Sequence, residues 1–583
     1  MPPFNVHLHD EYNLLLRRDS SDLRPDLRNS ASTAVLIFLL AGCGESDTSS
    51  VAPRATHGGT LVITASGDPE TLLPPLASTV PAKIIGDLVY DHLAIVGDSM
   101  NVVGDTGFRP QLARSWRWSD DSLSIAFNID PEARWHDGRP VRASDVRFTW
   151  EVYSNPSNGS PYAGSIATID SVTVRDSVTA VVWFGRRSPM QFYDAVNAMA
   201  ILPQHLLGGP TGPALRSAAV ARAPVGSGRF RFVRWNAAAS IELAADTGNY
   251  RGRPGLDRVI MTIAPDFNGA LARLLGGEAD LIEQVPPTSL AQVVADSSLR
   301  LLLNPGLDYN FVQFNLRHPK IRSRPHPLFA DRALRRALTH AVDRPRSVQN
   351  AYDSLAYVAL GPTVRAYPTT DPRLRQIPYS PDLARRTLDS LGWRDADGDG
   401  FRERNDVKLE FTLAVPSSSK SRNTVAILMQ DQLKQVGAKM NLELLDFTTF
   451  IDRETRRDFD AVFGGWRVEP SPGGIRQTWT SAGSRAGSGT NYGSYENPAF
   501  DALVDSALAA GSLAERRAIF TRAYQTIIDD APAIWIAEPK TVMAIHRRIE
   551  TRGLRPDAWW VNVADWTIPP GSRIERDRPP AVH

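Results

Sequence analysis

Apolar positions follow strand-like patterns in several parts of the chain. Residues 59–65 (GTLVITA) are almost continuously apolar, which predicts a buried strand near the start of the folded body. Residues 124–129 (SIAFNI) alternate apolar and polar positions, as a half-buried strand does. Residues 172–184 alternate likewise, and the polar triplet at 175–177 interrupts them, which predicts a hairpin of two strands.

Helical patterns are interleaved with these strands. Residues 331–342 (DRALRRALTHAV) place their apolar side chains on one stripe, and Gly392 is suited to end another helix. Because strands and helices alternate and no fixed-period repeat is visible, the pattern predicts an α/β protein. The predicted helix starts are Asp331, Ser380 with Pro381, and Ser512 with Glu515.

The length and charge of the chain narrow this picture. A chain of 583 residues exceeds what one hydrophobic core usually serves, so two large lobes are expected, with a ligand in the cleft between them. The formal net charge is only +1, which gives no general attraction to nucleic acid. No nucleic-acid partner is therefore predicted.

The first 43 residues have the order of a secretory signal. Arginines precede the apolar run at residues 31–40, and Ala41-Gly42-Cys43 follows it. Ten apolar residues are too few for a membrane-spanning helix, which needs about 20. The segment resembles a bacterial lipobox, which implies a lipid on Cys43, whereas the alternative is a small-residue cleavage site with an incidental cysteine. Residues 44–57 are polar and small, as in a flexible tether.

Known catalytic and metal-binding patterns are sparse. The sequence contains no G-x-S-x-G elbow, H-E-x-x-H helix or P-loop, and Cys43 is its only cysteine. We therefore expect no catalytic residues, no cofactor and no thiolate metal cluster, although a secreted hydrolase stays open. One acidic loop has the spacing of an EF-hand calcium loop up to Gly400, but an acidic turn is the favoured interpretation. Its carboxylates are Asp395, Asp397, Asp399 and Asp406.

Collinear motifs resemble one protein family over most of the chain. Residues 110–116 (PQLARSW) and 135–146 (WHDGRPVRASDV) are followed by Leu391-Gly392-Trp393, Gly465-Trp466 and Tyr495-Glu496-Asn497-Pro498, within a match from about residue 58 to about 539. This order resembles the family 5 extracellular solute-binding proteins, which serve peptide and nickel ABC importers.

The resemblance implies a type II periplasmic-binding fold with two lobes that close about a hinge. The expected first lobe is residues 58–308, with an extra subdomain at about 100–224, and the second is residues 309–535. Residues 536–583 are expected to return to the first lobe and to form a tail. The implied protein is an extracytoplasmic, lipid-anchored monomer that delivers its ligand to a permease with ATPase subunits.

The resemblance also implies ligand-binding residues in the second lobe. Gly465, Trp466 and Arg467 match a segment that offers backbone groups to a peptide, and Glu469 matches the acidic residue that pairs with the peptide's ammonium group. Most relatives have Asp there, and the alternative for Glu469 is a solvated loop carboxylate. Asn491 and Tyr492 are weaker candidates. A nickel chelate, an oligosaccharide or another small solute remains an alternative ligand.

The motif histidine His136 invites a catalytic or metal-binding interpretation. No second histidine or cysteine stands near it at metal-ligand spacing. We therefore expect His136 to stabilise a turn.

Overall fold

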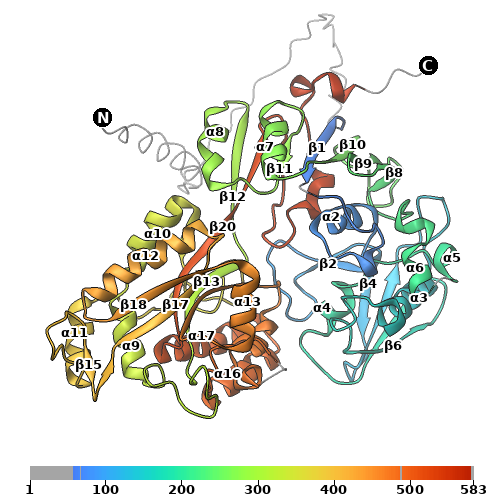
Figure 1. Ribbon diagram of the computed structural model, residues 1–583. Coiled ribbons are helices and arrows are strands. Elements are labelled where there is room, and N and C mark those ends of the chain that lie inside the picture. Colours follow the sequence, from blue (N-terminus) through green and yellow to red (C-terminus); the bar gives the residue numbers. More distant parts are fainter. Residues whose placement is uncertain (1–56, 66, 210, 486–488, 579–583) are drawn as a thin grey trace, which may run out of the picture. The chain divides into compact units, whose positions relative to one another are not determined.

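The structure is a computed structural model that describes residues 57–65, 67–209, 211–485 and 489–578 (Figure 1). The predicted signal segment, Cys43 and all of the predicted tether except His57 lie outside the described residues. Among the described residues, no helix is long and apolar enough to cross a membrane.

One half of the main sheet is built on the first predicted strand. This strand, β1, pairs in parallel with β10 on one side and with β11 on the other. The outer strands β9 and β8 continue the sheet beyond β10 in antiparallel order. The bounds are Thr60–Ala65 (β1), Phe230–Asn236 (β8), Ser240–Ala245 (β9), Arg258–Ile263 (β10) and Leu281–Ile282 (β11).

The other half of the main sheet has the order β18-β17-β19-β13, followed by β20. Helices α9 to α13 belong to this half of the chain, and α16 and α17 follow them in sequence. The strand bounds are Asp308–Phe314 (β13), Glu410–Pro416 (β17), Lys439–Leu445 (β18) and Ala461–Arg467 (β19). The helix bounds are Arg332–His340 (α9), Arg344–Tyr352 (α10), Pro381–Ser390 (α11), Lys420–Lys434 (α12), Phe447–Arg456 (α13), Pro498–Ala509 (α16) and Leu513–Asp530 (α17).

The long strand β20, Ala533–His546, belongs to both halves (Figure 1). Its first part pairs with β13 and with β14 (Ala356–Val358), and its second part pairs with β12 (Leu299–Pro305) and β11. The turn between β12 and β13 crosses beside it, because a Cβ on Gly306 would lie only 2.1 Å from the carbonyl oxygen of Pro539. Two backbone segments therefore connect the two halves at one place.

A separate four-stranded sheet, β4-β5-β7-β6, lies in the chain between α2 (Val80–Val89) and β8. Helix α3, Ala143–Ser154, packs against it. The predicted hairpin is confirmed, because β6 and β7 pair antiparallel. The strand bounds are Ala113–Trp118 (β4), Ser124–Ile129 (β5), Ile169–Val174 (β6) and Thr179–Phe184 (β7).

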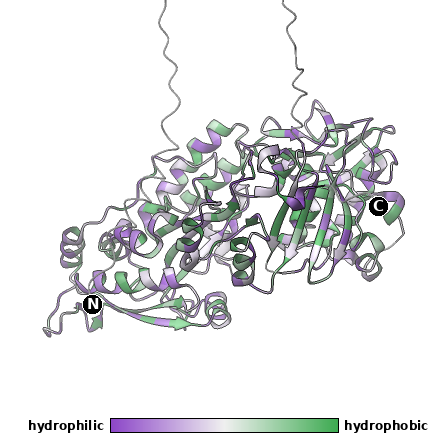
Figure 2. Ribbon diagram, turned by 90° about the horizontal axis from the view of Figure 1, so that it is seen from above, coloured by the Kyte–Doolittle hydropathy of each residue, from purple (hydrophilic) through white to green (hydrophobic). Residues whose placement is uncertain are grey.

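The apolar residues form separate cores rather than one. The largest core joins β1, the four-stranded sheet and residues near the C-terminus such as Trp566, whereas a second core lies around β17, α9 and α12. Figure 2 shows hydrophobic residues gathered on the strands, while the helices carry both kinds of residue. The predicted caps are confirmed at three helices. Asp331, Ser380 and Ser512 each accept a backbone N–H of the helix that follows.

Candidate ligand-binding site

The strand β19 carries three of the predicted binding residues and has one edge without a complete strand partner. On one side β13 pairs with it along its whole length, from Ala461 to Arg467. On the other side β17 pairs only with Ala461 and Val462. Among the described residues no strand covers this edge from Phe463 to Arg467. An extended ligand can add to such an edge through main-chain hydrogen bonds.

Polar side chains from neighbouring elements fill the space above this strand at Gly465. A Cβ on Gly465 would lie 2.4 Å from Oδ1 of Asn310 and 2.5 Å from a guanidinium nitrogen of Arg422, so these side-chain ends would have to move to admit one. Trp466 stacks on Tyr492, with ring centroids 6.1 Å apart. Arg467 forms an ion pair with Asp308 at 3.2 Å. The side chains packed closely against Gly465 are therefore polar and not apolar.

Glu469 lies just beyond the strand and lines a cavity of about 670 Å³. From the same segment Pro470 and Ser471 line it too, and the hydroxyl of Tyr367 donates to the carbonyl oxygen of Glu469. The opposite walls come from residues 74–200 and from residues 555–561 near the C-terminus. Their polar and aromatic members include Lys83, Asp87, Tyr153, Tyr162, Tyr193, Asp194, Arg555, Asp557 and Trp560.

Glu469 influences the charge of Lys83 on helix α2. Burial alone would lower the pKa of Lys83, but the negative charge of Asp87, together with Tyr162 and Glu469, raises it above its usual value. Burial would raise the pKa of Asp87, but a hydrogen bond from His92 and the charge of Lys83 lower it. Lys83 and Asp87 are therefore both charged at neutral pH, one turn apart on the same helix.

Asn491 and Tyr492 have different surroundings from Glu469. Asn491 is fully buried, its amide donates to the carbonyls of Thr480 and Tyr495, and its Oδ1 accepts the N–H of Tyr495. These bonds use its polar atoms to hold a loop, so its position assigns it a structural role. Tyr492 covers Trp466 instead. Of the six predicted binding residues, Glu469 alone lines the 670 Å³ cavity.

His136 makes the structural contacts expected of it. Its Nε2 lies 2.9 Å from the carbonyl oxygen of Gly228, and its Nδ1 accepts the N–H of Gly226 at 3.3 Å. Burial lowers its pKa, which favours the neutral ring. The histidine thus joins its own turn to a loop about 90 residues further along the chain.

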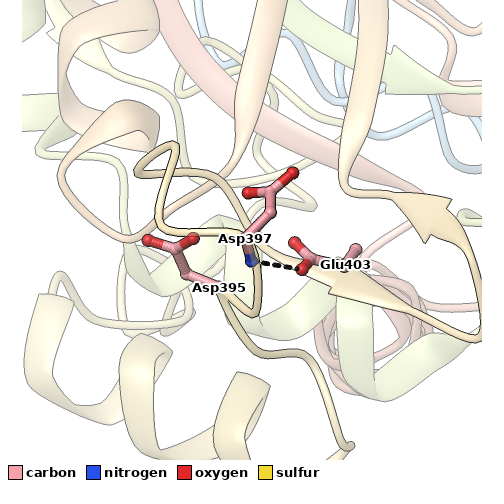
Figure 3. A group of neighbouring side chains, drawn as sticks. All are labelled: Asp395, Asp397 and Glu403. Atoms are coloured by element: carbon pink, nitrogen blue, oxygen red, sulfur yellow. Dashed lines mark hydrogen bonds between the residues drawn. The ribbon is translucent and has the colours of Figure 1, made fainter.

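The carboxylates that come together in the acidic loop are not the set that the EF-hand spacing suggested. Asp395, Asp397 and Glu403 place one carboxylate oxygen each within 4.8 Å of one another, whereas Asp406 is not in the group (Figure 3). Oε1 of Glu403 accepts the N–H groups of Ala396 and Asp397. Asp397 also pairs with the ammonium group of Lys408, at 3.2 Å. These internal contacts favour the acidic turn, and metal binding there is not proposed.

Several cavity residues were not predicted from the sequence. Lys83 and Asp87 share one helix face because they are four residues apart, and that spacing is the only signal of them in the sequence. Tyr162 comes from a loop, and Tyr193 and Asp194 come from the short helix Gln191–Val196, where no pattern distinguishes cavity residues from surface residues.

The comparisons with known proteins settle the family. Residues 107–487 match the family described as bacterial extracellular solute-binding proteins, family 5 Middle. The chain belongs to this family. The resemblance seen in the sequence is thereby confirmed.

Individual relatives span nearly the whole chain. The chain is 27% identical over 550 residues to the oligopeptide-binding protein AppA of Bacillus subtilis (strain 168), which covers 92% of this chain and 98% of AppA. The structure of that AppA with a nonapeptide matches with a TM-score of 0.65 and 25% identity, covering 88% of this chain and 99% of that chain.

Two further solved structures share the fold. The substrate-binding protein CtaP of Listeria monocytogenes matches with a TM-score of 0.74 at 23% identity, over 88% of this chain and 99% of that one. NikZ of Campylobacter jejuni, solved with Ni(L-His), matches with a TM-score of 0.67 at 22% identity, over 88% of this chain and all of the other. The predicted fold class, an α/β periplasmic-binding-protein fold of type II, is confirmed.

Proposed function

We propose that this solute-binding protein captures peptides in the cleft at Glu469 and delivers them to an ABC importer. The observation that carries the proposal is the combination of a β19 edge that no described strand pairs with beyond Val462 and a carboxylate just beyond the end of that strand. A peptide chain can pair with the edge, and its ammonium group can pair with Glu469 in a charge-assisted hydrogen bond. The oligopeptide-binding relative, similar over 92% of this chain, supports the same ligand class.

The backbone edge explains how such a site can accept many peptides. Main-chain hydrogen bonds do not depend on the side chains of the ligand. Closure of the two lobes about the crossing strands near Gly306 and Pro539 would then exclude water from the bound peptide. The function needs no covalent chemistry and no cofactor. We therefore assign binding and not catalysis to the cleft.

A nickel chelate is the second candidate ligand, because NikZ, solved with Ni(L-His), shares the fold. The cavity argues against an anionic chelate. Four carboxylates line it against the two cationic side chains Lys83 and Arg555 and the histidine His92. A peptide with its positive ammonium group fits this charge better.

The proposed location is outside the cytoplasm. Residues 1–43 have the features of a signal with a lipid-accepting Cys43, which would hold the protein at the membrane near a permease and its ATPases. A single folded chain contains the whole cleft, which supports a monomer.

A thermal-shift screen of the purified full chain tests the ligand class. We expect di- to hexapeptides to raise the melting temperature, because a ligand that binds only the folded state stabilises it. Nickel-histidine chelates and oligosaccharides serve as the competing classes, and Glu469→Ala as the site variant. A shift with sugars or chelates alone would contradict the peptide proposal. A peptide-induced shift of equal size in wild type and Glu469→Ala would contradict the assignment of the site to Glu469.

A further inference from the structure

We propose that Asp194 receives a basic side chain near the amino end of the bound peptide, so that the protein prefers peptides with lysine or arginine there. This inference rests on the proposed peptide-binding function. Asp194 lines the same cavity as Glu469, which we assign to the peptide's ammonium group. A ligand anchored at Glu469 therefore has its first side chains within this cavity.

The first step is that Asp194 lacks a partner of opposite charge within 4 Å. Its carboxylate lies on the short helix α4, Gln191–Val196, and accepts one hydrogen bond, from the hydroxyl of Thr168 at 2.8 Å. Among the described residues, no lysine, arginine or histidine forms an ion pair with it, and Arg186 acts on it only from a distance. Because burial outweighs these contacts, the pKa of Asp194 rises to about 6.

The second step is that the other cavity carboxylates are already balanced. The carboxylate of Asp557 accepts hydrogen bonds from Nε and from a second guanidinium nitrogen of Arg555. Asp87 accepts the indole N–H of Trp560 at 2.8 Å and lies 3.5 Å from His92. Asp87 and Glu469 both act on Lys83. When the peptide's ammonium group occupies Glu469, Asp87 still balances Lys83.

The third step is that the cavity walls suit a cation. The rings of Tyr153, Tyr162 and Tyr193 line it, and Lys83 already lies over one of them, with Nζ 5.4 Å from the ring centroid of Tyr162. Aromatic faces attract ammonium and guanidinium groups, and more strongly where water is excluded. A second cation beside Asp194 would thus gain a charge-assisted hydrogen bond as well as an aromatic contact.

Lys83 is the observation that could favour the opposite preference, for an acidic side chain. Its own charge is held by Asp87 one turn away, and by Tyr162. Asp194 has only Arg186, which lies beyond ion-pair distance. The unbalanced charge in the cavity is therefore negative, which favours a basic ligand side chain.

The test is a calorimetric titration of the full chain with tripeptides that carry lysine, norleucine or glutamate at the first or second position. Norleucine has nearly the same apolar length as lysine but no charge. We expect lysine peptides to bind wild type about tenfold more tightly than norleucine peptides, which corresponds to one charge-assisted contact. In Asp194→Asn the preference should fall to about one. Asp120→Asn, an exposed carboxylate of the same subdomain, is the matched control and should keep the preference.

Each outcome decides between the two proposals. Equal affinity of wild type for lysine and norleucine peptides, or tighter binding of glutamate peptides, would overturn the role of Asp194 and leave peptide capture intact. The role of Asp194 would also be overturned if the Asp194→Asn variant still bound norleucine peptides and kept the full preference for lysine peptides. Binding of none of the tripeptides would remove peptide capture and this inference together.

Discussion

Single charged residues in the cleft carry most of the testable chemistry. Glu469 is exposed on a loop that the family motif locates, so the sequence was sufficient to predict a carboxylate that the structure places at the cavity. Asn491 belongs to the same stretch of motifs, yet its side-chain amide donates hydrogen bonds to the backbone carbonyls around it. Sequence position alone could not separate these two residues, because the difference lies in which way the loop turns each side chain.

Glu469→Gln tests the ammonium contact with little change in shape. We expect the affinity for a free peptide to fall by a factor of about ten or more, because a hydrogen bond to a charged group contributes about 1.5–3 kcal/mol. Calorimetry of wild type and variant measures the ratio. Glu132→Gln, at an exposed glutamate in the turn after β5, should leave the affinity unchanged. An equal affinity in wild type and Glu469→Gln would show that this loop carboxylate is only solvated.

Glu454 provides a pH-dependent prediction. Its side chain is only 7% exposed beside Gly464, and burial raises its pKa to about 7, with the charge of Arg422 acting in the opposite direction. The folded protein therefore holds this proton between about pH 4.5 and 7 while the unfolded chain has lost it. Stability should fall as pH rises through that window, by about 3 kcal/mol in all.

Glu454→Gln should remove that dependence. Urea unfolding at pH 5 and pH 8 measures the free energy of unfolding of wild type and variant. We expect the variant to gain stability relative to wild type at pH 8 compared with pH 5, and Glu132→Gln to show no such gain. A difference between variant and wild type that is the same at both pH values would contradict the buried, protonated carboxyl group.

Secondary-structure elements were predicted best where a local signal marks their ends. The starts of α9, α11 and α17 follow from Asp331, Ser380 and Ser512, because a capping side chain acts within its own turn. Strand order could not be predicted in the same way, since β20 pairs with strands more than 200 residues away. The edge of β19 that no described strand pairs with beyond Val462 is likewise a property of its neighbours β13 and β17 and not of its own sequence.

The crossing of β20 and the turn at Gly306 gives a prediction at the scale of elements. Gly306→Ala would put a methyl group 2.1 Å from the carbonyl oxygen of Pro539, so backbone must move. We expect a loss of about 1–3 kcal/mol in the free energy of unfolding, measured by urea denaturation. Gly511→Ala, which meets nothing within 4 Å, should change it by less than about 0.5 kcal/mol. Equal effects of the two substitutions would contradict the close crossing.

The whole molecule combines a family-level assignment with details that only the folded chain displays. Motifs spread over about 480 residues indicated the family, and the match of residues 107–487 confirms it. The cavity charges could not be derived that way, because they bring together α2, α4, Glu469 and the C-terminal segment around Arg555. The proposed lobe boundaries, at about residues 308 and 535, stay a prediction.

Cys43 determines the proposed attachment of the whole molecule to a membrane. We expect the full chain, expressed in a bacterial host, to sediment with membranes and to incorporate labelled fatty acid. Cys43→Ser should lose both properties, because a single lipid-accepting thiol has been removed and the sequence has no other cysteine. Labelling that persists in Cys43→Ser would place the lipid elsewhere, and an unlabelled wild type would contradict the anchor.

The most direct measurement of the central claim is a calorimetric titration of the full chain with a defined mixture of tri- to hexapeptides, beside the same mixture acetylated at the amino terminus. Acetylation removes the ammonium charge and leaves the peptide backbone and side chains in place. Peptide capture at Glu469 predicts saturable heat with the free peptides and affinity at least tenfold weaker with the acetylated ones. No binding of free peptides at concentrations up to the millimolar range would contradict peptide capture, and equal binding of both mixtures would contradict the site.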